Sequence, residues 1–509
     1  MSKDKSSSLS ISSTDLTTCI KVLSTFTNNG EYSSIESDEF DSIRTILCSL
    51  YHIEKHLNKK TKKPYERPIK LIDQKAIRLR RAKKFQPQHS IIPDSIVQIE
   101  TINDDNKNHT TQQLNDSTFC YICKLKYDRL HFFYNQLCPS CAKFNYEKRI
   151  QTTNLTNCIA LVTGGRIKIG YRIVLKLLRA NCFVITTSRF PMDFLNRLNK
   201  EQDFEQWKDR INIYGIDFRY SQLVELFTEM LIEKYDRLDF LINNASQTIR
   251  QSKESYQHLF HHERLINYSL LPNDQQKILN GNLQFYERLV PFSNPVQQTS
   301  SSSYPLCLPY TNDSNNSPIQ TSIIVNHTSF DVNQQIIDFH STNSSLSRLG
   351  DLSTIEMNEA LTINTLAPFI LNSKLKVLMA DKHPNPDSTK FIINVSSTES
   401  LFSQSNKTDQ HSHINATKAA LNMMTRTSAI DYQKSNIFMV SVDTDLINDN
   451  NSLEKTMIDQ DYQIPLDEED AAARVLDPII DTYKQISEEK IDVNIPYGCF
   501  LKNYHICNW

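Results

Sequence analysis

The sequence predicts an α/β protein with a doubly wound parallel sheet, preceded by a small metal-binding module and N-terminal helices. Three observations carry this prediction. Short apolar, β-rich runs alternate with helical patterns from residue 157 onward. Three of only 8 glycines, Gly164, Gly165 and Gly170, lie together directly after the first of these runs. Ahead of that run, four cysteines form two closely spaced pairs.

Length and composition allow a folded core and exclude several classes of protein. With 509 residues the chain is long enough for about three domains. Hydrophobic residues make up 39% of it, which argues against disorder of the whole chain, and the net charge of −2 argues against a globally basic nucleic-acid binder. We expect no membrane span and no secretion signal, because no long apolar run is present. The 11 cysteines suit a reducing compartment, so we expect a cytoplasmic protein, with the nucleus as the alternative.

The first part of the chain divides into an N-terminal helical region and a linker. Apolar spacing predicts amphipathic helices at about 14–27 and 36–57, within a region of residues 1–58. Residues 59–117 are first basic and then polar, and we interpret them as a linker. The basic run from Arg78 to Lys84 could contact phosphate, but a solvated helix face is the simpler interpretation because aromatic residues do not interleave it.

Two CxxC pairs form a candidate metal site in a module that we place at residues 118–150. The pairs are Cys120 with Cys123 and Cys138 with Cys141. Each pair can place two thiolates on one ion at a tight turn, and two pairs close a tetrahedral shell that suits Zn²⁺. The alternative is four free or redox-active thiols. Because a four-thiolate site is closed, we expect the zinc to fold the module and not to catalyse.

The elements of the sheet follow in order along the rest of the chain. Continuously apolar runs predict buried strands at 158–163, 182–187, 211–216, 239–242, 391–395 and 437–442, with a last strand at 498–501. Helical patterns lie between them at 169–180, 221–235, 355–380 and 415–433. We expect an insertion at about 250–355, with ordered flanks and a disordered centre rich in Ser, Asn, Gln, Thr and Pro.

The first strand leads into a helix through Thr163-Gly164-Gly165-Arg166-Ile167-Lys168-Ile169-Gly170. A glycine turn lets the backbone approach a pyrophosphate, and the helix N-terminus supplies N–H groups and a positive dipole. This order predicts a dinucleotide-binding loop. The second strand ends in Thr187-Ser188-Arg189, without an acid for a ribose 2′-hydroxyl, whereas Arg189 could pair with a 2′-phosphate. We therefore expect NADP in preference to NAD, with Lys168 as a second candidate for the 2′-phosphate.

An ordered set of motifs resembles the short-chain dehydrogenase/reductase family over about residues 155–505. After the glycine loop come LINNAS (241–246), INTLAPF with Asn364, NVSS (394–397), INATKAALNMM with Lys418 and VSVDTD (440–445). The resemblance implies a Rossmann fold whose cofactor contacts come from the loop residues Thr163, Gly164, Gly165, Lys168, Ile169 and Gly170. It further implies that Asp217 contacts adenine, and that Asn243 and Ala245 shape the cofactor floor.

The resemblance also implies a catalytic group, Asn364, Ser397 and Lys418, that lacks its tyrosine. In this family hydride moves between the nicotinamide and a carbonyl carbon. The tyrosine exchanges the oxygen's proton, the lysine holds the nicotinamide ribose and the serine hydrogen-bonds the substrate oxygen. The tyrosine of the YxxxK motif is Ile414 here, the middle glycine of the loop is Lys168, and the Pro-Gly pair after the sixth strand is Thr444-Asp445.

Other residues near position 414 could take over part of the missing role. Asn415 could donate a hydrogen bond but cannot shuttle a proton. His411 and His413 titrate in a suitable range, although a surface histidine is the simpler interpretation of each. The chain also resembles a set of uncharacterised eukaryotic proteins that join a CxxC…CxxC module to such a domain. They carry an asparagine-containing segment in place of YxxxK, which implies a subfamily trait and supplies no substrate.

The resulting hypothesis is an NADP(H)-dependent oxidoreductase that acts on a carbonyl or alcohol of a small molecule, fused to a structural zinc module. The alternative is a catalytically silent NADP(H)-binding sensor or scaffold whose zinc module binds a protein partner. Nucleic-acid binding through residues 59–84 and the module is a third, less favoured hypothesis. Assembly of the chain into a homo-oligomer is a further hypothesis.

Overall fold

The structure, a computed structural model, describes only part of the chain. The described residues are 113–250, 253–265, 268–289, 347–380, 382, 384–385, 388–404, 407–445, 465–490 and 493–509. The helices predicted at 14–27 and 36–57, the basic stretch and the centre of the insertion lie outside them. The chain divides into two compact units, 1–79 and 80–509, and all described residues belong to the second.

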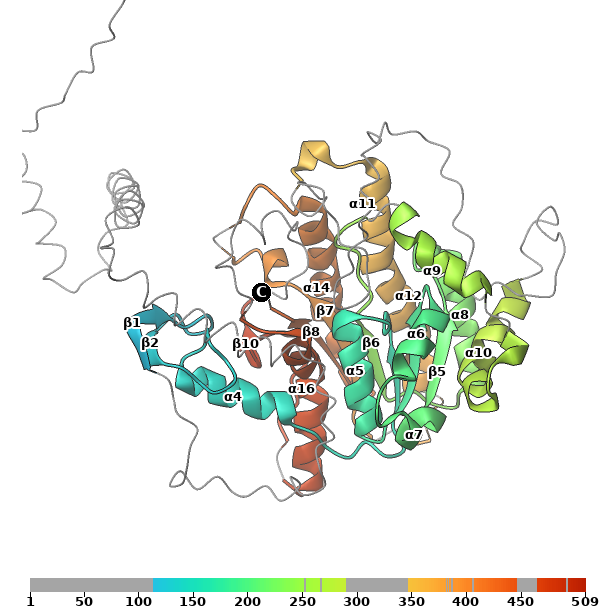
Figure 1. The fold of residues 1–509 in the computed structure, drawn as a ribbon, viewed down its shortest axis with the longest axis horizontal. Helices are drawn as coiled ribbons and strands as arrows, with labels where there is room; N and C mark the ends of the chain where they lie inside the picture. The colour runs from blue at the N-terminus through green and yellow to red at the C-terminus, as the bar shows by residue number, and fades with distance from the viewer. Residues whose placement is uncertain are drawn as a thin grey trace, which may run out of the picture. The chain divides into compact units, whose positions relative to one another are not determined.

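An eight-stranded sheet is the main element of the second unit (Figure 1). Its order is β10-β9-β8-β7-β6-β3-β4-β5, and all neighbours pair in parallel except β9 and β10. The strands are β3 (Ile159–Val162), β4 (Phe183–Ser188), β5 (Ile211–Gly215), β6 (Phe240–Asn243), β7 (Lys390–Ser396), β8 (Ile437–Asp443), β9 (Phe500–Lys502) and β10 (His505–Cys507). The predicted doubly wound parallel α/β fold of Rossmann type is confirmed. The connections reverse direction between β3 and β6, the place where such sheets bind ligands.

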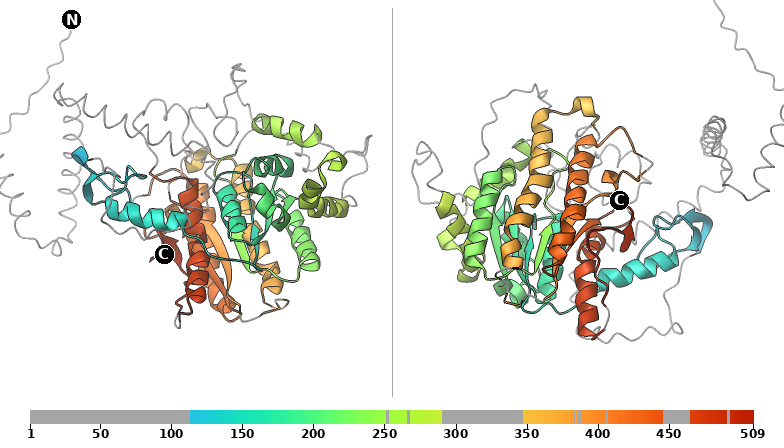
Figure 2. Two further views of the ribbon diagram at one scale, coloured as in Figure 1. Left: turned by 60° about the horizontal axis from the view of Figure 1, so that its bottom comes forward. Right: turned by 180° about the vertical axis from the view of Figure 1, so that it is seen from behind.

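Helices cover both faces of the sheet, as Figure 2 shows from two further directions. Alternate strand residues pack toward α5 (Lys168–Arg179) and α16 (Glu468–Ser487), among them Val162, Ile242 and Ile393. Their neighbours Leu161, Leu241 and Ile392 belong to the core beneath α8 (Ser221–Lys234), α12 (Ala367–Lys374) and α14 (Ser412–Gln433). Both faces are buried, which explains the continuously apolar strands. Each such side chain contributes about 1.5–3 kcal/mol by its burial.

The ordered flank of the insertion covers the edge strand β5. It consists of α9 (Lys253–Leu265), η4 (Tyr268–Leu270) and α10 (Asn273–Leu289). Asn282 of α10 accepts a hydrogen bond from the Gly215 N–H at 2.6 Å. A Cβ on Gly281 would lie only 2.3 Å from the Tyr214 hydroxyl oxygen, so the helix backbone lies directly against the strand. The flank thereby protects an edge that would otherwise expose unpaired backbone groups.

Several short elements complete the domain. Between β4 and β5 lie α6 (Pro191–Leu198), α7 (Phe204–Trp207) and η3 (Lys208–Arg210). Before β7 the chain forms η8 (Leu349–Asp351), α11 (Thr354–Leu361), the π-helical turn η9 (Thr362–Leu366) and, after α12, α13 (Lys376–Met379). The turn η10 (Thr398–Ser400) follows β7. Of the helices that the structure describes, none is long and apolar enough to cross a membrane.

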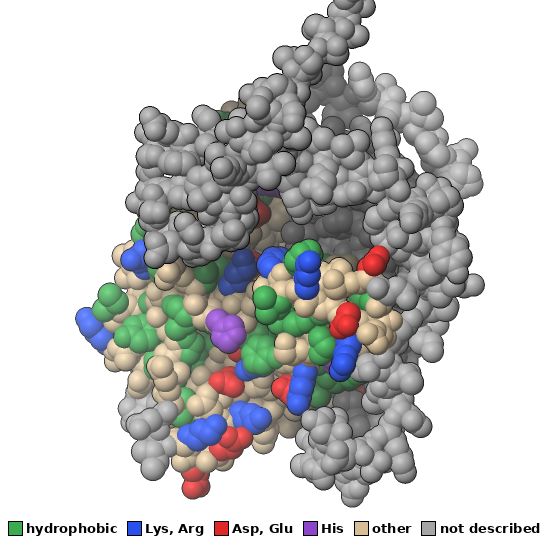
Figure 3. All heavy atoms as spheres, turned by 90° about the vertical axis from the view of Figure 1, so that its left-hand side faces the viewer, with side chains coloured by type: hydrophobic (Ala, Val, Ile, Leu, Met, Phe, Trp, Pro, Cys, Tyr) green, Lys and Arg blue, Asp and Glu red, His purple; other side chains and the backbone are tan. Residues whose placement is uncertain are grey.

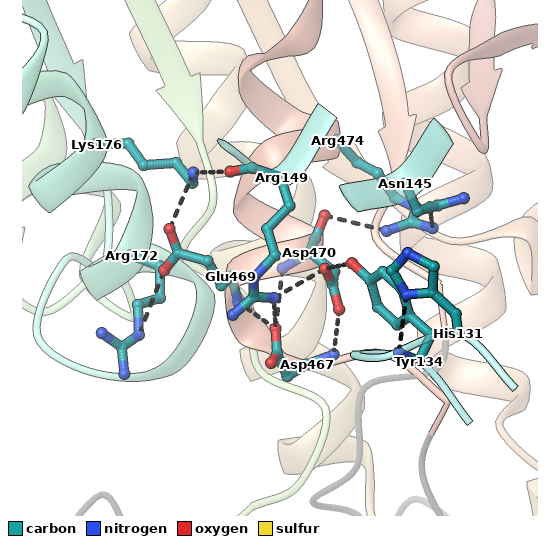
Figure 4. Close-up of polar contacts among 10 residues, drawn as sticks. All are labelled: His131, Tyr134, Asn145, Arg149, Arg172, Lys176, Asp467, Glu469, Asp470 and Arg474. Atoms are coloured by element: carbon teal, nitrogen blue, oxygen red, sulfur yellow. Dashed lines mark hydrogen bonds and ion pairs between the residues drawn. The ribbon is translucent and has the colours of Figure 1, made fainter. Parts of the chain in front are cut away.

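The four cysteines belong to a small module in front of the sheet. Strands β1 (Gln113–Phe119) and β2 (Lys126–Arg129) pair antiparallel, and α4 (Pro139–Ile150) begins directly after Cys138. We call residues 113–150 the four-cysteine module. Its helix α4 packs against α16, and Figure 4 shows the polar contacts between the module and this helix. Arg149 forms ion pairs with Asp467 at 2.5 Å and with Asp470 at 2.8 Å.

Further polar contacts join the four-cysteine module to α16. The Tyr134 hydroxyl donates a hydrogen bond to Asp470 (Figure 4). Arg474 donates to Asn145 at 2.8 Å, and Lys148 pairs with Asp477 at 2.7 Å. Arg474 and Asp470 are fully buried, so these charges stabilise the contact only because each has a partner. The four-cysteine module is therefore docked on its own chain through a buried, paired polar surface.

Candidate functional site

The glycine turn between β3 and α5 leaves no space for side chains. Gly164 has a φ of +71°, in the left-handed region that favours glycine. A Cβ on Gly165 would lie 2.1 Å from Thr186 Oγ1, and one on Gly170 would lie 2.0 Å from the Gly164 carbonyl oxygen. The backbone of the turn is thus held tightly against β4 and the start of α5. This is the geometry by which a turn can bring N–H groups close to a phosphate.

The other loop residues fix this turn to its surroundings. Thr163 Oγ1 accepts hydrogen bonds from the Asn244 and Ala245 N–H groups at 3.0 and 2.9 Å, and so joins β3 to the segment after β6. Ile169 packs against the hydrophobic core. Lys168, at the position of the family's middle glycine, has a φ of +55°. A side chain in this conformation costs roughly 1–2 kcal/mol, so the backbone keeps a glycine-like shape although the residue has changed.

Positive charge gathers at the end of β4, beside the turn. The Arg189 guanidinium lies 4.5 Å from the centroid of the Tyr256 ring, and Arg166 pairs with Asp193 at 2.6 Å. Burial would raise the pKa of Tyr256, but the charges of Arg189, Arg166 and Lys168 bring it below its ordinary value. Tyr256 lies on α9 of the insertion, and sequence analysis did not identify it because no motif marks it.

Asp217, the residue expected at the adenine, is held by a neighbouring arginine. Arg219 Nη2 lies 2.7 Å from Asp217 Oδ2, and its Nε contacts both carboxylate oxygens. Burial would raise the pKa of Asp217, but Arg219 and Arg189 hold it below the usual range. The carboxylate is therefore ionised, and it orders Arg219 at the end of β5.

Asn243 and Ala245 support the sheet and the turn. The Asn243 side-chain amide donates to Asn372 and Asn394, each at 2.8 Å, within a buried network that joins β6, β7 and α12. The Cα of Ala245 lies only 3.1 Å from the point where a Cβ on Gly164 would stand. Ala245 thus closes over the glycine turn, while Asn243 fixes the strand that leads to it.

Asn364 lies on the π-helical turn η9 and uses both ends of its amide. Its Oδ1 accepts from the Gln247 N–H at 2.8 Å and from the Ser246 hydroxyl at 3.0 Å. Its Nδ2 donates to the Gln247 carbonyl and to Thr417 Oγ1, each at 3.1 Å. Isolated π-helical turns often mark functional sites. Here the turn places Asn364 so that it connects the segment after β6 with α14.

Lys418 and Ser397 both lie near the end of β7. Lys418 is 5% exposed, and its Nζ donates to the Val395 carbonyl at 2.8 Å. Burial lowers its pKa to about 8. Ser397, two residues beyond Val395, is half-buried, and its Oγ accepts from the Glu399 N–H at 3.3 Å. An ammonium and a hydroxyl are thereby positioned at the carboxyl end of the sheet, close to the switch between β3 and β6.

The position of the missing tyrosine holds a buried apolar side chain. Ile414 is 8% exposed and lies one turn before Lys418 on α14. His411 precedes the helix as its N-cap, with a φ of +62°. His413 is buried in the first turn, and burial lowers its pKa while Glu356 of α11 opposes this shift. His413 is thus close to α11, and Asn415 donates its backbone N–H to the His411 carbonyl.

The four cysteines converge as a metal site requires. The sulfurs of Cys120, Cys123, Cys138 and Cys141 all lie within 4.8 Å of one another. The Cys123 and Cys138 sulfurs are 3.7 Å apart. Four thiolates about 2.3 Å from one Zn²⁺ in a tetrahedron would be about 3.8 Å apart. The cluster therefore fits a four-coordinate metal.

Two contacts near the end of β8 were missed from the sequence. Asp443 is buried, which raises its pKa, and it accepts a hydrogen bond from the Thr398 hydroxyl. The Tyr121 hydroxyl, from the Cys120–Cys123 turn, donates to Asp445 at 2.5 Å. Neither pair is adjacent in sequence, and the two partners come together only through the docking of the four-cysteine module and the pairing of β7 with β8.

Comparisons with known proteins agree with this geometry. Residues 158–271 match the family model described as short chain dehydrogenase. An uncharacterized protein, R665, of Acanthamoeba polyphaga mimivirus is 28% identical over 388 residues, which are 73% of each chain. Residues 158–271 are therefore similar to short-chain dehydrogenases.

Several solved structures resemble the chain at low sequence identity. The complex of Pseudomonas aeruginosa RhlG with NADP is 16% identical, with a TM-score of 0.37 over 64% of this chain and 90% of that one. A short chain dehydrogenase of Burkholderia cenocepacia in complex with NADP is 16% identical, with a TM-score of 0.38 over 64% and 91%. A short-chain dehydrogenase from Streptomyces avermitilis is 14% identical, with a TM-score of 0.38 over 69% and 90%.

Proposed function

We propose that this chain is an NADP(H)-dependent oxidoreductase of the short-chain dehydrogenase/reductase type that interconverts a carbonyl and an alcohol. The observation that carries the proposal is the glycine turn, whose Gly165 and Gly170 have no space for a Cβ. Such a turn, at the switch point of a doubly wound sheet, suits a dinucleotide. The family match covers the same segment.

The preference for NADP(H) rests on the charge at the end of β4. No carboxylate follows this strand to accept a ribose 2′-hydroxyl, and Arg189 comes directly after it. Arg166 and Lys168 add positive charge near Tyr256, which lies against Arg189. A 2′-phosphate would gain charge-assisted hydrogen bonds from this group.

At the other end of the site, the chain's own residues would hold and polarise a carbonyl. NADPH, when bound, supplies the hydride that forms the new C–H bond. The Ser397 hydroxyl would donate to the substrate oxygen, and the Lys418 ammonium would hold ribose hydroxyls near the end of β7. The oxygen also needs a proton as its double bond to carbon becomes single, and Ile414 cannot give one. His411 is our candidate for this proton, because an imidazole can act as a general acid and this one directly precedes α14.

The four-cysteine module is proposed to hold one structural zinc ion. Cys120, Cys123, Cys138 and Cys141 would be its ligands, and the spacing of their sulfurs supports this. The two turns that carry the thiolates would then depend on the metal for their shape.

A silent NADP(H)-binding sensor or scaffold is the second candidate. The buried Ile414 favours it, and so do exposed apolar side chains on the four-cysteine module. Phe119, Leu125 and Phe132 are 60%, 68% and 43% exposed. Figure 3 views the side where the module lies in Figure 1 and shows hydrophobic side chains among lysines and arginines on this face. Such side chains could bind a protein partner.

Native mass spectrometry of the purified full chain tests the proposal directly. We expect one zinc ion per chain, and a further mass increase when NADPH is added. A fourfold Cys→Ser variant at the module should lose the zinc. A wild-type chain that takes up zinc but neither NADPH nor NADH would contradict the proposed oxidoreductase and leave only the metal site.

A further inference from the structure

A chain of hydrogen bonds connects the four-cysteine module to the reaction end of the proposed cofactor site. Its first member is Tyr121, which lies between the metal-ligand candidates Cys120 and Cys123. The Tyr121 hydroxyl donates to Asp445 Oδ1 at 2.5 Å. Asp445 stands two residues beyond the end of β8 and has a φ of +67°. The module thus contacts the loop that leaves the sheet beside Ser397.

The chain continues through Asp443 to the end of β7. The Asp445 N–H donates to Asp443 Oδ1 at 3.2 Å, and the Thr398 hydroxyl donates to Asp443 Oδ2. Asp443 and Ser396 are paired across β7 and β8, so Thr398 and Ser397 lie at the same edge. Each link is specific, because Asp443 is buried and accepts these donors with both of its carboxylate oxygens. A shift of Asp445 would therefore move the backbone next to Ser397.

The module also holds the segment that follows residues 446–464 in the sequence. Arg149 pairs with Asp467, the N-cap of α16, whose side chain accepts from the Glu469 and Asp470 N–H groups. Asp445 and Asp467 are thus both held by the module, by a phenol and by a guanidinium. The contact of the module with α5 is at Lys176, in the last turn of that helix and away from the glycine turn at its start.

The direction of a bound dinucleotide follows from the charges. The pyrophosphate would lie at the start of α5 and the 2′-phosphate at Arg189 on the β4 side of the switch. The nicotinamide would then extend across β6 and β7 toward Ser397 and Asp445. The module therefore contacts the nicotinamide end of the site, whereas the adenosine end is built by the glycine turn and β4.

We propose that the four-cysteine module positions the nicotinamide end of the cofactor site, with Tyr121 as the positioning residue, an inference that rests on the proposed binding of NADP(H) and zinc. Metal binding would fix the Cys120–Cys123 turn and hence the Tyr121 hydroxyl. Asp445, Asp443 and Thr398 would pass this constraint to the backbone at Ser397. Because such coupling is reciprocal, NADP⁺ should also strengthen the retention of zinc.

This coupling is tested by comparing the whole dinucleotide with a ligand that carries only its adenosine end. Affinities of NADP⁺ and of 2′,5′-ADP, which carries only the adenosine end, are measured by calorimetry on the zinc-loaded full chain. Tyr121→Phe removes one hydroxyl and no metal ligand. We expect it to weaken NADP⁺ roughly 5-fold or more, within the usual range of coupling between sites, and to leave 2′,5′-ADP unchanged. Zinc content, read by mass spectrometry, should stay at the wild-type value.

Three further variants keep the result interpretable. Tyr127→Phe is the matched control, because the Tyr127 hydroxyl donates at 2.8 Å to the Asn135 carbonyl within the module. It should change neither affinity. Asp445→Asn keeps an oxygen that can accept from Tyr121 and should retain most of the NADP⁺ affinity, whereas Asp445→Ala should resemble Tyr121→Phe. If Tyr121→Phe does not fold, Asp445→Ala and removal of zinc from the wild type replace it.

The outcomes separate this inference from the function on which it rests. Selective weakening of NADP⁺ supports the positioning role. Unchanged affinity for NADP⁺, or equal weakening of both ligands, overturns it while NADP(H) binding stands. If neither ligand binds to the zinc-loaded wild type, the proposed function is contradicted and the positioning role falls with it.

Discussion

The two ends of the proposed cofactor site differ in how strongly the sequence constrains them. At the adenosine end, Gly165 and Gly170 admit no side chain, and even Lys168 keeps a φ of +55°. At the nicotinamide end, Ile414 stands where the resemblance implies a tyrosine, and Thr444-Asp445 stands where it implies a Pro-Gly pair. The turn needs glycine because a side chain would clash there, so its position can be predicted from the sequence. The proposed reaction end is built from side chains that can be exchanged, and we propose that the four-cysteine module supports it from outside.

Placing a tyrosine at position 414 is expected to have the largest effect on the proposed reaction end. Ile414→Tyr should create or raise carbonyl reduction with NADPH by about 10²–10⁴-fold, the contribution of a positioned general acid. Ser397 and Lys418 already stand at the positions for which the resemblance implies the other catalytic groups. Turnover is measured against a panel of ketones, aldehydes and quinones. Ile414→Phe is the control, since it adds the ring without the hydroxyl.

Equal turnover by the tyrosine and phenylalanine variants would contradict the general-acid argument. If His411 already acts as the acid, His411→Ala should abolish the native activity. No turnover by any of these proteins, with NADPH binding intact, would favour the silent sensor.

The buried lysine gives a pH test of the same end. Burial lowers the pKa of Lys418 to about 8, against a usual 10.5. Between these values the unfolded chain holds a proton that the folded chain has released, so this group adds stability as the pH rises through the window. The change is on the order of 3 kcal/mol.

Urea unfolding of the wild type and of Lys418→Met, at about pH 7 and about pH 10, measures it. From the lower to the higher pH, the free energy of unfolding of the wild type should rise relative to that of the variant. If the free energies of unfolding of the two proteins change in parallel with pH, burial does not lower the pKa of Lys418.

At the adenosine end, Arg189→Ala should weaken NADPH more than NADH. The loss of charge-assisted hydrogen bonds to a 2′-phosphate costs about 1.5–3 kcal/mol, or roughly 10- to 150-fold in affinity. Arg179→Ala is the matched control, because Arg179 ends α5 far from the turn and pairs with Asp203 at 2.7 Å. Calorimetric titration with NADPH and with NADH measures both affinities. An equal loss of affinity for the two cofactors would show that Arg189 does not bind the 2′-phosphate.

The smallest expected effect tests the steric argument alone. Gly170→Ala would place a Cβ 2.0 Å from the Gly164 carbonyl oxygen, which cannot yield without distorting the turn. We expect a loss of about 1–3 kcal/mol, a fall of several degrees in Tm. Gly350→Ala is the control, since no atom lies within 4 Å of its added Cβ. Equal Tm values for the two variants would show that the turn tolerates side chains.

Much of the sheet could be predicted because its strands are buried on both faces. The runs at 158–163 and 437–442 are almost entirely apolar. The observed β3 is one residue shorter than the first run at each end, and β8 is one residue longer than the second at its carboxyl end. The helix α16 was not predicted, because its apolar face is interrupted by Asp470 and Arg474, charges that are buried only through partners on α4. Tyr121 and Tyr256 act through contacts between distant segments, and no local pattern indicates such contacts.

We expect the glycine turn and Arg189 to bind NADP(H) even though the reaction end differs from the family pattern. Calorimetric titration of the purified, zinc-loaded full chain with NADPH and with NADH tests it most directly. We predict saturable binding of one NADPH per chain, about tenfold or more tighter than NADH. Binding of neither cofactor, or equal affinity for both, would contradict the account.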